Sequence, residues 1–210
     1  MNLADLRRDY AGEPLSERDV DHNPIAQFEK WFEQAMRAGM TESNAMTLAT
    51  ATRDGVPSAR IVLLKGVDER GFVFFTDYRS RKGTELESNP RASLCFFWEA
   101  LHRQVRVSGT VVRVAREESE IYFHSRPHDS QVGAWASHQS STLASRELLE
   151  TEVARLEQQH PGDVPLPPHW GGYRVTPEVI EFWQGRPSRL HDRIVYTRES
   201  SGWTLGRLSP

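Results

Sequence analysis

Two continuous apolar runs dominate residues 60–82 and predict a pair of β-strands. The runs 61–64 and 72–75 are rich in β-branched and aromatic residues, and Gly71, with the polar residues before it, is a turn signal between them. This pattern predicts a β-hairpin. Because neither run alternates with polar residues, we expect both strands to be covered on both faces.

Helical periodicity appears in several other stretches. Asn23 followed by Pro24 is typical of a helix start, and Gly39 of a helix end. The residues expected on the buried face of this helix are Ile25, Phe28, Phe32, Ala35 and Met36. Further helices are predicted over residues 81–88, 116–125, 128–135 and 145–160, with Ser80 and Ser145 as N-caps of the first and the last.

The remaining apolar segments predict antiparallel β-structure. Strands are expected at residues 45–52, 57–65, 91–98 and 103–114, and in two final hairpins, 172–175 with 179–184 and 193–198 with 203–208. Strands dominate and helices are inserted between them. This order indicates an α+β fold, an antiparallel barrel that is closed or partly open, with helices packed outside. Residues 1–22 are polar and predict a mobile N-terminal arm, and residues 23–210 predict a single domain.

Composition narrows the classes of protein that fit. The chain has 210 residues, a formal net charge of −3 and a single cysteine, Cys95. A mildly acidic chain is not expected to bind nucleic acid or an anionic membrane, and one cysteine cannot form an internal disulfide, which fits a reducing compartment. The sequence contains no signal-peptide pattern, membrane-length apolar run, nucleotide-binding glycine loop or zinc motif. We expect a cytoplasmic protein without a metal.

Cations and hydroxyl groups frame the first strand pair and suggest an anion site. Arg60 and Lys65 lie at the ends of one predicted strand, and Thr76, Arg81 and Lys82 follow the other, at a helix start. Unpaired N–H groups and the helix dipole favour negative charge at such a position. The alternative is a solvated basic turn on a small barrel.

Two later stretches carry similar chemistry. Tyr122 and Arg126 lie four residues apart, so they share a helical face and could surround a second phosphate together with Ser130. An ordinary helix end is the alternative. Gln139 and Ser140 lie in a polar loop whose amide and hydroxyl groups could bond a flavin ring edge or a phosphate, or simply form a turn.

A third stretch places like charges at alternate positions. Arg189, His191 and Arg193 follow an aromatic pair and a Gly/Pro turn, and they would point to one side of an extended strand. Crowded positive charges cost free energy unless an anion lies beside them. We therefore interpret this segment as part of a binding site, with a solvated edge strand as the alternative.

Taken together, the motifs of the chain closely resemble the pyridoxine/pyridoxamine 5′-phosphate oxidase family. They are R-I-V-L-L-K at 60–65, F-F-T-x-x-x-S-R-K at 74–82, R-Q-V-R-V at 103–107, Y-F-H-S-R-P-x-D-S-Q at 122–131, G-A-W-A-S-x-Q-S-S at 133–141, P-x-x-W-G-G-Y-R-V at 167–175, E-F-W-Q-G at 181–185 and R-L-H-D-R at 189–193. The resemblance implies the FMN-binding split barrel, a Greek-key type of antiparallel barrel, and a homodimer with FMN at the subunit interface.

The resemblance also implies roles for individual residues. The positions matching FMN-binding residues are Arg60, Ile61, Val62, Leu63, Leu64, Lys65, Phe75, Thr76, Arg81, Lys82, Gln104, Gln139, Ser140, Trp183 and Arg193. The positions matching substrate-binding residues are Arg7, Arg8, Asp9, Tyr10, Lys65, Tyr122, Arg126, Ser130, Arg189, Leu190 and His191, with Arg189 and His191 as the implied catalytic pair. Phe75 stands where many members of the family carry Tyr, and the implied contact there is through the backbone.

The implied reaction oxidises pyridoxine 5′-phosphate or pyridoxamine 5′-phosphate to pyridoxal 5′-phosphate, in vitamin B6 biosynthesis and salvage. A hydride passes from the substrate to FMN, and O2 reoxidises the flavin to give H2O2, with NH3 released from the amine. Two rival classes stay open: a non-catalytic FMN- or pyridoxal-phosphate-binding module, and a split-barrel reductase with a nicotinamide or deazaflavin partner. The Tyr122, Arg126 and Ser130 set favours the oxidase, since the reductase does not need it.

Overall fold

The structure is a computed structural model of the chain, and it describes residues 2–3 and 9–210. The candidate residues Arg7 and Arg8 lie outside the described residues. The helices are α1 (Pro24–Arg37), α2 (Arg81–Ser88), α3 (Arg116–His124), α4 (His128–Ala136) and α5 (Arg146–Gln159), with short 3-10 turns η2 (Glu99–Leu101) and η3 (Pro187–Arg189). The strands are β1 (Ala45–Ala51), β2 (Pro57–Leu63), β3 (Gly66–Asp68), β4 (Gly71–Asp77), β5 (Arg91–Trp98), β6 (Arg103–Arg113), β7 (Trp170–Gln184), β8 (Asp192–Glu199) and β9 (Gly202–Arg207).

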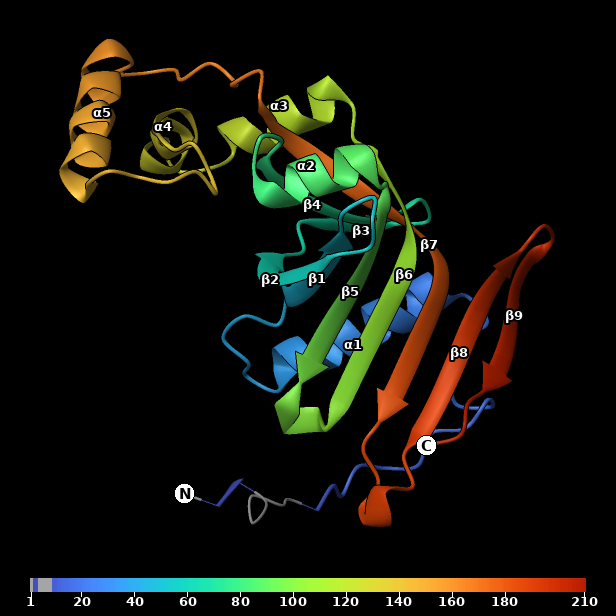
Figure 1. The fold of residues 1–210 in the computed structure, drawn as a ribbon. Helices are drawn as coiled ribbons and strands as arrows, with labels where there is room; N and C mark the ends of the chain where they lie inside the picture. Colours follow the sequence, from blue (N-terminus) through green and yellow to red (C-terminus); the bar gives the residue numbers. More distant parts are fainter. Residues whose placement is uncertain (1, 4–8) are drawn as a thin grey trace.

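The strands form one curled antiparallel sheet in the order β2-β1-β5-β6-β7-β4-β3, with β8 and β9 added beside β7 (Figure 1). Strand β7 is the central strand, because it connects β6 with both β4 and β8. One of its edges pairs with β6, whereas the other pairs with β4 over residues 170–175 and with β8 over residues 179–184. The predicted hairpin of 172–175 with 179–184 was therefore wrong. Pro177 lies at a bulge opposite Gly109, which lets one long strand bend and serve both parts of the sheet.

The predicted hairpin between residues 61–64 and 72–75 was also wrong. β2 pairs with β1, and β4 pairs with the short strand β3 and with β7. β4 is buried along almost its whole length, as its apolar run predicts. β2 lies at the edge of the sheet, and Ile61 is 64% exposed. Within this chain, β2 is therefore not covered on both faces as predicted.

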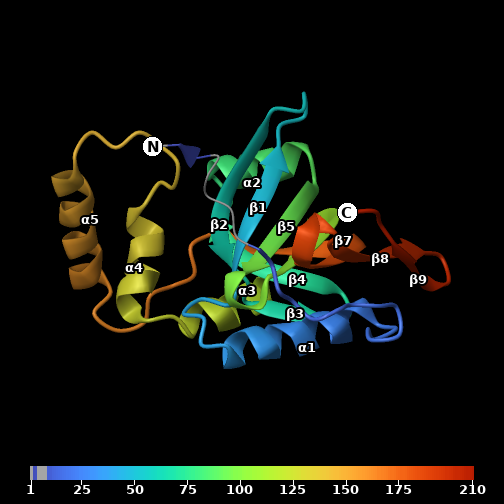
Figure 2. The ribbon, with the colours of Figure 1, turned by 90° about the horizontal axis from the view of Figure 1, so that it is seen from below.

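Helix α1 covers one face of the sheet and fills the core (Figures 1 and 2). The Asn23 side chain accepts a hydrogen bond from the Ile25 N–H at the helix start, as predicted. The Phe28 ring packs edge-on against Phe72, 4.9 Å between centroids. Two residues depart from the predicted apolar face, because Met36 is 52% exposed and Trp31, which the pattern missed, is buried.

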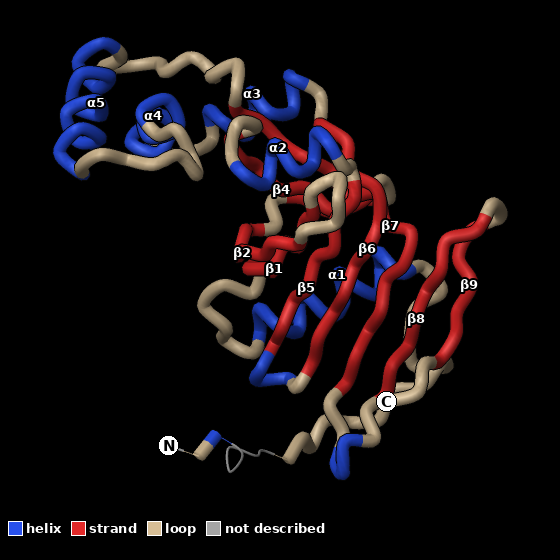
Figure 3. The backbone as a smooth tube through the Cα atoms, viewed as in Figure 1, coloured by secondary structure: helices blue, strands red, loops and turns tan. Residues whose placement is uncertain are grey.

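Helices α3, α4 and α5 form a second layer at one end of the sheet (Figure 3). Their own apolar cluster includes Phe123, Val132 and Leu156 and reaches the sheet at Trp170. α4 lies between α5 and the sheet (Figure 2), and the loop that follows α4 reaches β4, where Thr76 donates a hydrogen bond to Gln139 Oε1 over 2.9 Å.

Residues 9–22 lie against the C-terminal part of the chain, without helix or strand and with a turn at residues 17–20. Leu15 is buried, its N–H donates to Asp192 Oδ2 over 3.1 Å, and its carbonyl accepts from Arg207 over 3.0 Å. Gly12 and Gly185 are joined by a backbone hydrogen bond of 3.2 Å. The predicted arm thus has specific contacts with the domain, and its mobility stays a prediction.

Candidate functional site

A cavity of about 790 Å³ opens between the sheet edge and the helical layer. Predicted site residues that line it are Arg60, Ile61, Val62, Leu63, Lys65, Phe75, Thr76, Arg81, Lys82, Tyr122, Arg126, Ser130, Gln139 and Ser140. They come from β2, β4, α2, α3, α4 and the loop after α4, so segments far apart in the sequence meet here. The side chain of Leu64, a further predicted residue, is buried in the core instead.

The N-terminus of α2 forms one wall of this cavity. Ser80 caps the helix by accepting a hydrogen bond from the Gly83 N–H. Lys82 is buried, and its Nζ donates to Gln139 Oε1 over 2.7 Å and to Thr76 Oγ1 over 3.0 Å. Burial, and then the positive charge of Arg60, lower the pKa of Lys82 to about 8. A bound anion would stabilise the protonated lysine, so this wall is suited to a phosphate.

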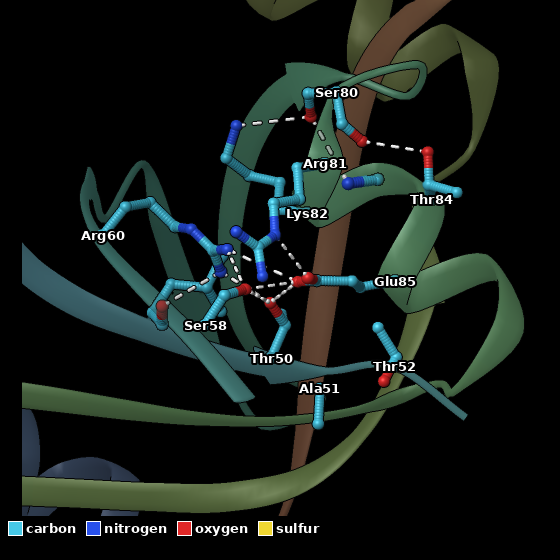
Figure 4. A network of polar contacts seen from close by, with 12 residues as sticks. Thr50, Ala51, Thr52, Ser58, Arg60, Ser80, Arg81, Lys82, Thr84 and Glu85 are labelled. Carbon is cyan, nitrogen blue, oxygen red and sulfur yellow. Dashed lines mark hydrogen bonds and ion pairs between the residues drawn. The ribbon is translucent and has the colours of Figure 1, made fainter. Parts of the chain in front are cut away.

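Arg60 and Arg81 extend this positive wall and share one carboxylate (Figure 4). Glu85 contacts Arg60 at 3.4 Å and Arg81 at 2.9 Å, and its side chain is only 4% exposed. Burial alone would raise the pKa of Glu85, but hydrogen bonds from Ser58, Thr50 and Arg81 lower it to about 2. Glu85 is therefore ionised at any working pH.

The opposite wall is aromatic and carries a second cationic group. The ring of Phe75 stacks on Tyr122 at 4.0 Å and on Trp170 at 5.5 Å between centroids. The Arg126 guanidinium lies over the Trp170 ring, and its Nη1 atom is buried without a hydrogen-bond partner in the described part of the protein. Burial lowers the pKa of Arg126. A buried N–H group without a partner is costly, so an anion here would satisfy it.

Aspartate is scarce in this cavity. Among the described residues that line it, the one carboxylate is Asp77, which is held by Arg79 over 2.8 Å. Five cations line the cavity, and the carboxylates close to them are Asp77 and, behind Arg60 and Arg81, Glu85, so the lining keeps a net positive charge and is suited to anionic ligands.

The other predicted residues gather at the far end of the sheet. Gln104 lies opposite Trp183, and Trp183 opposite Arg193, so the three share one face. This face is open in the single chain, since Phe97, opposite Gln104, is 51% exposed.

The expectation that Arg189, His191 and Arg193 point to one side of a strand was wrong. Arg189 ends the turn η3 with a φ of 61°, and only Arg193 lies within a regular strand pair. Arg193 is neutralised within the chain, because its Nε donates to Glu181 Oε1 over 2.8 Å. The alternation of positive charges resembles the two-residue period of a strand, but the segment before β8 is a turn.

His191 lies in an aromatic group with Tyr10 and Trp183. The Tyr10 ring contacts both edge-on, at 5.5 Å in each case. Burial, and then the charge of Arg189, lower the pKa of His191. Its Nδ1 accepts a hydrogen bond from the Arg186 N–H over 3.0 Å, so in the neutral ring Nε2 carries the proton and is a donor. Asp9 precedes Tyr10 in the same exposed segment, and Leu190 is 69% exposed.

Three residues at or behind the cavity were not predicted from the sequence: Ser58, Glu85 and Trp170. Ser58 and Trp170 line the cavity, and Glu85 lies behind its arginines. Glu85 had a local signal, since it lies four residues after Arg81 on a predicted helix and could pair with it. Ser58 had no such signal, and Trp170, although it lies in the motif at 167–175, is brought to the cavity only by the sheet pairing.

Comparison with known proteins identifies the family. A family model described as pyridoxamine 5′-phosphate oxidase matches residues 32–160, and a second, described as the pyridoxine 5′-phosphate oxidase C-terminal dimerisation region, matches residues 170–210. The chain belongs to the pyridoxamine 5′-phosphate oxidase family. This membership makes it an oxidoreductase, and the second match supports a homodimer, both as the sequence predicted.

Relatives of the chain in this family match over almost their entire length. A pyridoxine/pyridoxamine 5′-phosphate oxidase from Paraburkholderia phymatum is 59% identical over 99% of both chains. One of the same name from Rubrobacter xylanophilus is 60% identical over 100% of this chain and 97% of its own.

Solved structures confirm the predicted split-barrel fold of the oxidase family. PhzG from Burkholderia lata 383, in complex with tetrahydrophenazine-1-carboxylic acid, superposes with a TM-score of 0.90 at 34% identity, over 95% of this chain and 99% of its own. A pyridoxamine 5′-phosphate oxidase-related, FMN-binding protein from Nostoc punctiforme has a TM-score of 0.71 at 17% identity, over 87% and 97%, a likeness that shows the fold alone. Family membership suggests a flavin cofactor. Among the described residues, no helix is long and apolar enough to cross a membrane.

Proposed function

We propose that the protein is an FMN-dependent oxidase that converts pyridoxine 5′-phosphate and pyridoxamine 5′-phosphate to pyridoxal 5′-phosphate, with O2 as the acceptor and H2O2 as a product. The observation that carries this proposal is the cavity with two cationic walls. Lys82 lies beside Arg60 on one wall, and Arg126, with its unpartnered Nη1, lies on the other. Two phosphorylated molecules in one cavity, a cofactor and a substrate, would account for both walls.

The residues present fit FMN. Arg60, Arg81 and Lys82 would hold the FMN phosphate at the start of α2, with Thr76 nearby, and Gln139 and Ser140 would face the flavin ring edge. FMN, when bound, supplies the hydride acceptor and its reoxidation by O2. The chain supplies position: holding both reactants in alignment is worth roughly 7–11 kcal/mol at the upper end.

The opposite wall would bind the substrate phosphate. Arg126, Lys65, Tyr122 and Ser130 all line the same cavity. Lys65 also lies 5.9 Å from the centre of the Tyr122 ring, which keeps its charge close to this wall. A substrate held by its phosphate in this way would present its ring toward the flavin.

The remaining residues would come from the partner subunit of the homodimer. Trp183, Arg189, His191 and Arg193 lie within the matched dimerisation region, on or beside the open face of the sheet. They are not part of the cavity in their own chain. Arg189 would pair with oxygen substituents of the substrate, and His191 would donate a hydrogen bond from Nε2 rather than accept a proton there. Tyr10, which contacts Trp183 and His191, would cover this group from outside.

The experiment that tests the proposal is aerobic incubation of the FMN-loaded protein with each phosphorylated substrate, following aldehyde product and oxygen uptake together. Product matched by oxygen uptake is the expected result. A yellow, folded protein that forms no aldehyde and takes up no oxygen would refute the proposed oxidase activity and favour the non-catalytic binding module. Reduction of the flavin by NADPH without oxygen would instead indicate a reductase. Tetrahydrophenazine-1-carboxylic acid, the ligand of the PhzG structure, is a useful comparison because it carries a carboxylate and no phosphate.

A further inference from the structure

We propose that Glu85 is a positioning residue for the FMN phosphate, which aims the side chains of Arg60 and Arg81 into the cavity. This inference rests on the proposed function, because it assigns the phosphate of FMN to this wall. Glu85 was not among the residues that the motifs single out. It lies on α2, one helical turn after Arg81, with 4% of its side chain exposed.

Every oxygen of the Glu85 carboxylate is engaged. Oε1 accepts from Arg81 Nε over 2.9 Å. Oε2 accepts from the hydroxyl groups of Thr50 over 2.5 Å and Ser58 over 2.6 Å, and lies 3.4 Å from Arg60 Nη2. Figure 4 shows these side chains converging on Glu85 from β1, β2 and α2. One carboxylate thus connects β2 and α2, which line the cavity, with β1 behind them.

The geometry separates positioning from direct binding. The cavity is lined by Ser58, Arg60 and Arg81, and Glu85 lies behind them. Arg81 is 60% exposed, so without the carboxylate its long side chain would sample solvent. On the same side as Glu85, Arg60 donates to Thr50 Oγ1 over 2.6 Å and to Ser58 Oγ over 2.5 Å, and both hydroxyl groups in turn donate to Glu85.

The negative charge of Glu85 also has an opposite effect on FMN binding. Whether binding weakens or strengthens when Glu85 is replaced depends on which effect is larger. A carboxylate near a phosphate repels it, so removal of the charge alone would strengthen binding. The charge of Glu85 is, however, already shared among four donors, and two of them are guanidinium groups that would repel one another in its absence. We therefore expect the misplacement of Arg60 and Arg81 to weaken FMN binding more than the lost repulsion of the phosphate strengthens it.

The test compares Glu85→Ala and Glu85→Gln with Glu87→Gln. Glu87 lies on the same helix, 68% exposed and paired with Arg113, so it controls for a charge removed from α2. Binding of FMN and of riboflavin, which lacks the phosphate, is measured by flavin fluorescence on the full-length chain stripped of cofactor. Glu85→Ala should weaken FMN binding by roughly 10–100-fold, the equivalent of lost charge-assisted hydrogen bonds, and leave riboflavin binding unchanged.

Glu85→Gln should lose less FMN affinity than Glu85→Ala, because its oxygen can still accept from Thr50 and Ser58 while its amide cannot accept from Arg81. If circular dichroism shows that Glu85→Ala does not fold, the test rests on Glu85→Gln. A lower affinity for FMN with an unchanged affinity for riboflavin then supports the proposal. Unchanged or tighter FMN binding in a folded variant, or equal losses of FMN and riboflavin, would overturn it. Failure of the unsubstituted protein to bind FMN would instead refute the proposed function.

Discussion

The Arg126 guanidinium lies 4.7 Å from the centre of the Trp170 ring, and one of its nitrogens is buried without a partner in the described part of the chain. Trp170 belongs to β7 and Arg126 follows α3, so the sheet itself sets the direction of this cation. A planar guanidinium on an aromatic face is fixed in orientation, unlike a flexible ammonium group. The orientation of Arg126 is thus set before any ligand enters, as its proposed role in binding the substrate phosphate requires.

Arg126→Lys tests this wall. The variant keeps the charge but loses the fixed fork, so we expect KM for pyridoxine 5′-phosphate to rise by roughly 10–100-fold, with FMN still bound. Steady-state kinetics and flavin absorbance measure the two quantities. Arg146→Lys is the matched control, since Arg146 is 82% exposed on α5. An unchanged KM would contradict the role of Arg126 in substrate binding.

The lowered pKa of Lys82 predicts that the affinity for FMN depends on pH. Its pKa is lowered to about 8 by burial and then by Arg60, and a bound phosphate would raise it again. Above pH 8 the free lysine must take up a proton when FMN binds, so FMN affinity should fall with rising pH, at most about tenfold per pH unit. Titrations between pH 7 and pH 10 should show this slope, and Lys82→Gln should abolish it. The exposed Lys30→Gln is the control, and riboflavin binding should show no such slope.

Mixed dimers test whether two chains build each site. Arg126→Ala damages the cavity and Arg189→Ala damages the open face, and each alone should be nearly inactive. When both variants are co-expressed, half of the dimers are mixed, and each mixed dimer regains one intact site. Activity should therefore return to about one quarter of the unsubstituted level. Activity no greater than that of the separate variants would show that a single chain contains the complete site.

Arg207 tests the attachment of the N-terminal segment. It binds Glu17 over 3.0 Å, Asp192 over 2.7 Å and the Leu15 carbonyl over 3.0 Å. Arg207→Ala should make amide hydrogen exchange in residues 12–20 faster by roughly tenfold, while Tm changes little because Arg207 and Glu17 are each more than a third exposed to solvent. Arg198→Ala, at the other end of the same hairpin, should change neither. Equal exchange rates in both variants would mean that Arg207 does not hold this segment.

Local signals predicted most helices and their ends. Ser80 caps α2, Ser145 caps α5 and Asn23 caps α1, as the spacing of hydroxyl, amide and apolar residues indicated. A cap depends on groups within three residues of one another, so it can be predicted without knowledge of the fold. Burial depends on more distant neighbours, which is why Met36 of α1, placed on the buried face by periodicity, is 52% exposed.

Strand pairing was predicted where the partners are consecutive and missed where they are not. β8 and β9 follow one another and pair as the predicted hairpin requires, and the consecutive strands β5 and β6 pair as well. β4 pairs with β7, about 100 residues later in the sequence, and no local signal distinguishes that partner from β2. The two wrong hairpins both come from treating neighbours in sequence as neighbours in space.

The sequence by itself determined the chemistry that this protein has available: caps, cations, hydroxyl groups, aromatic rings and the motifs of its family. Only the tertiary structure decided which of them meet. It placed Glu85 behind Arg60, Trp170 under Arg126, and Arg189 and His191 far from the cavity in the same chain. The reason is physical: side-chain chemistry is a property of each residue, whereas proximity is set by long-range pairing and packing, which depend on the whole chain at once.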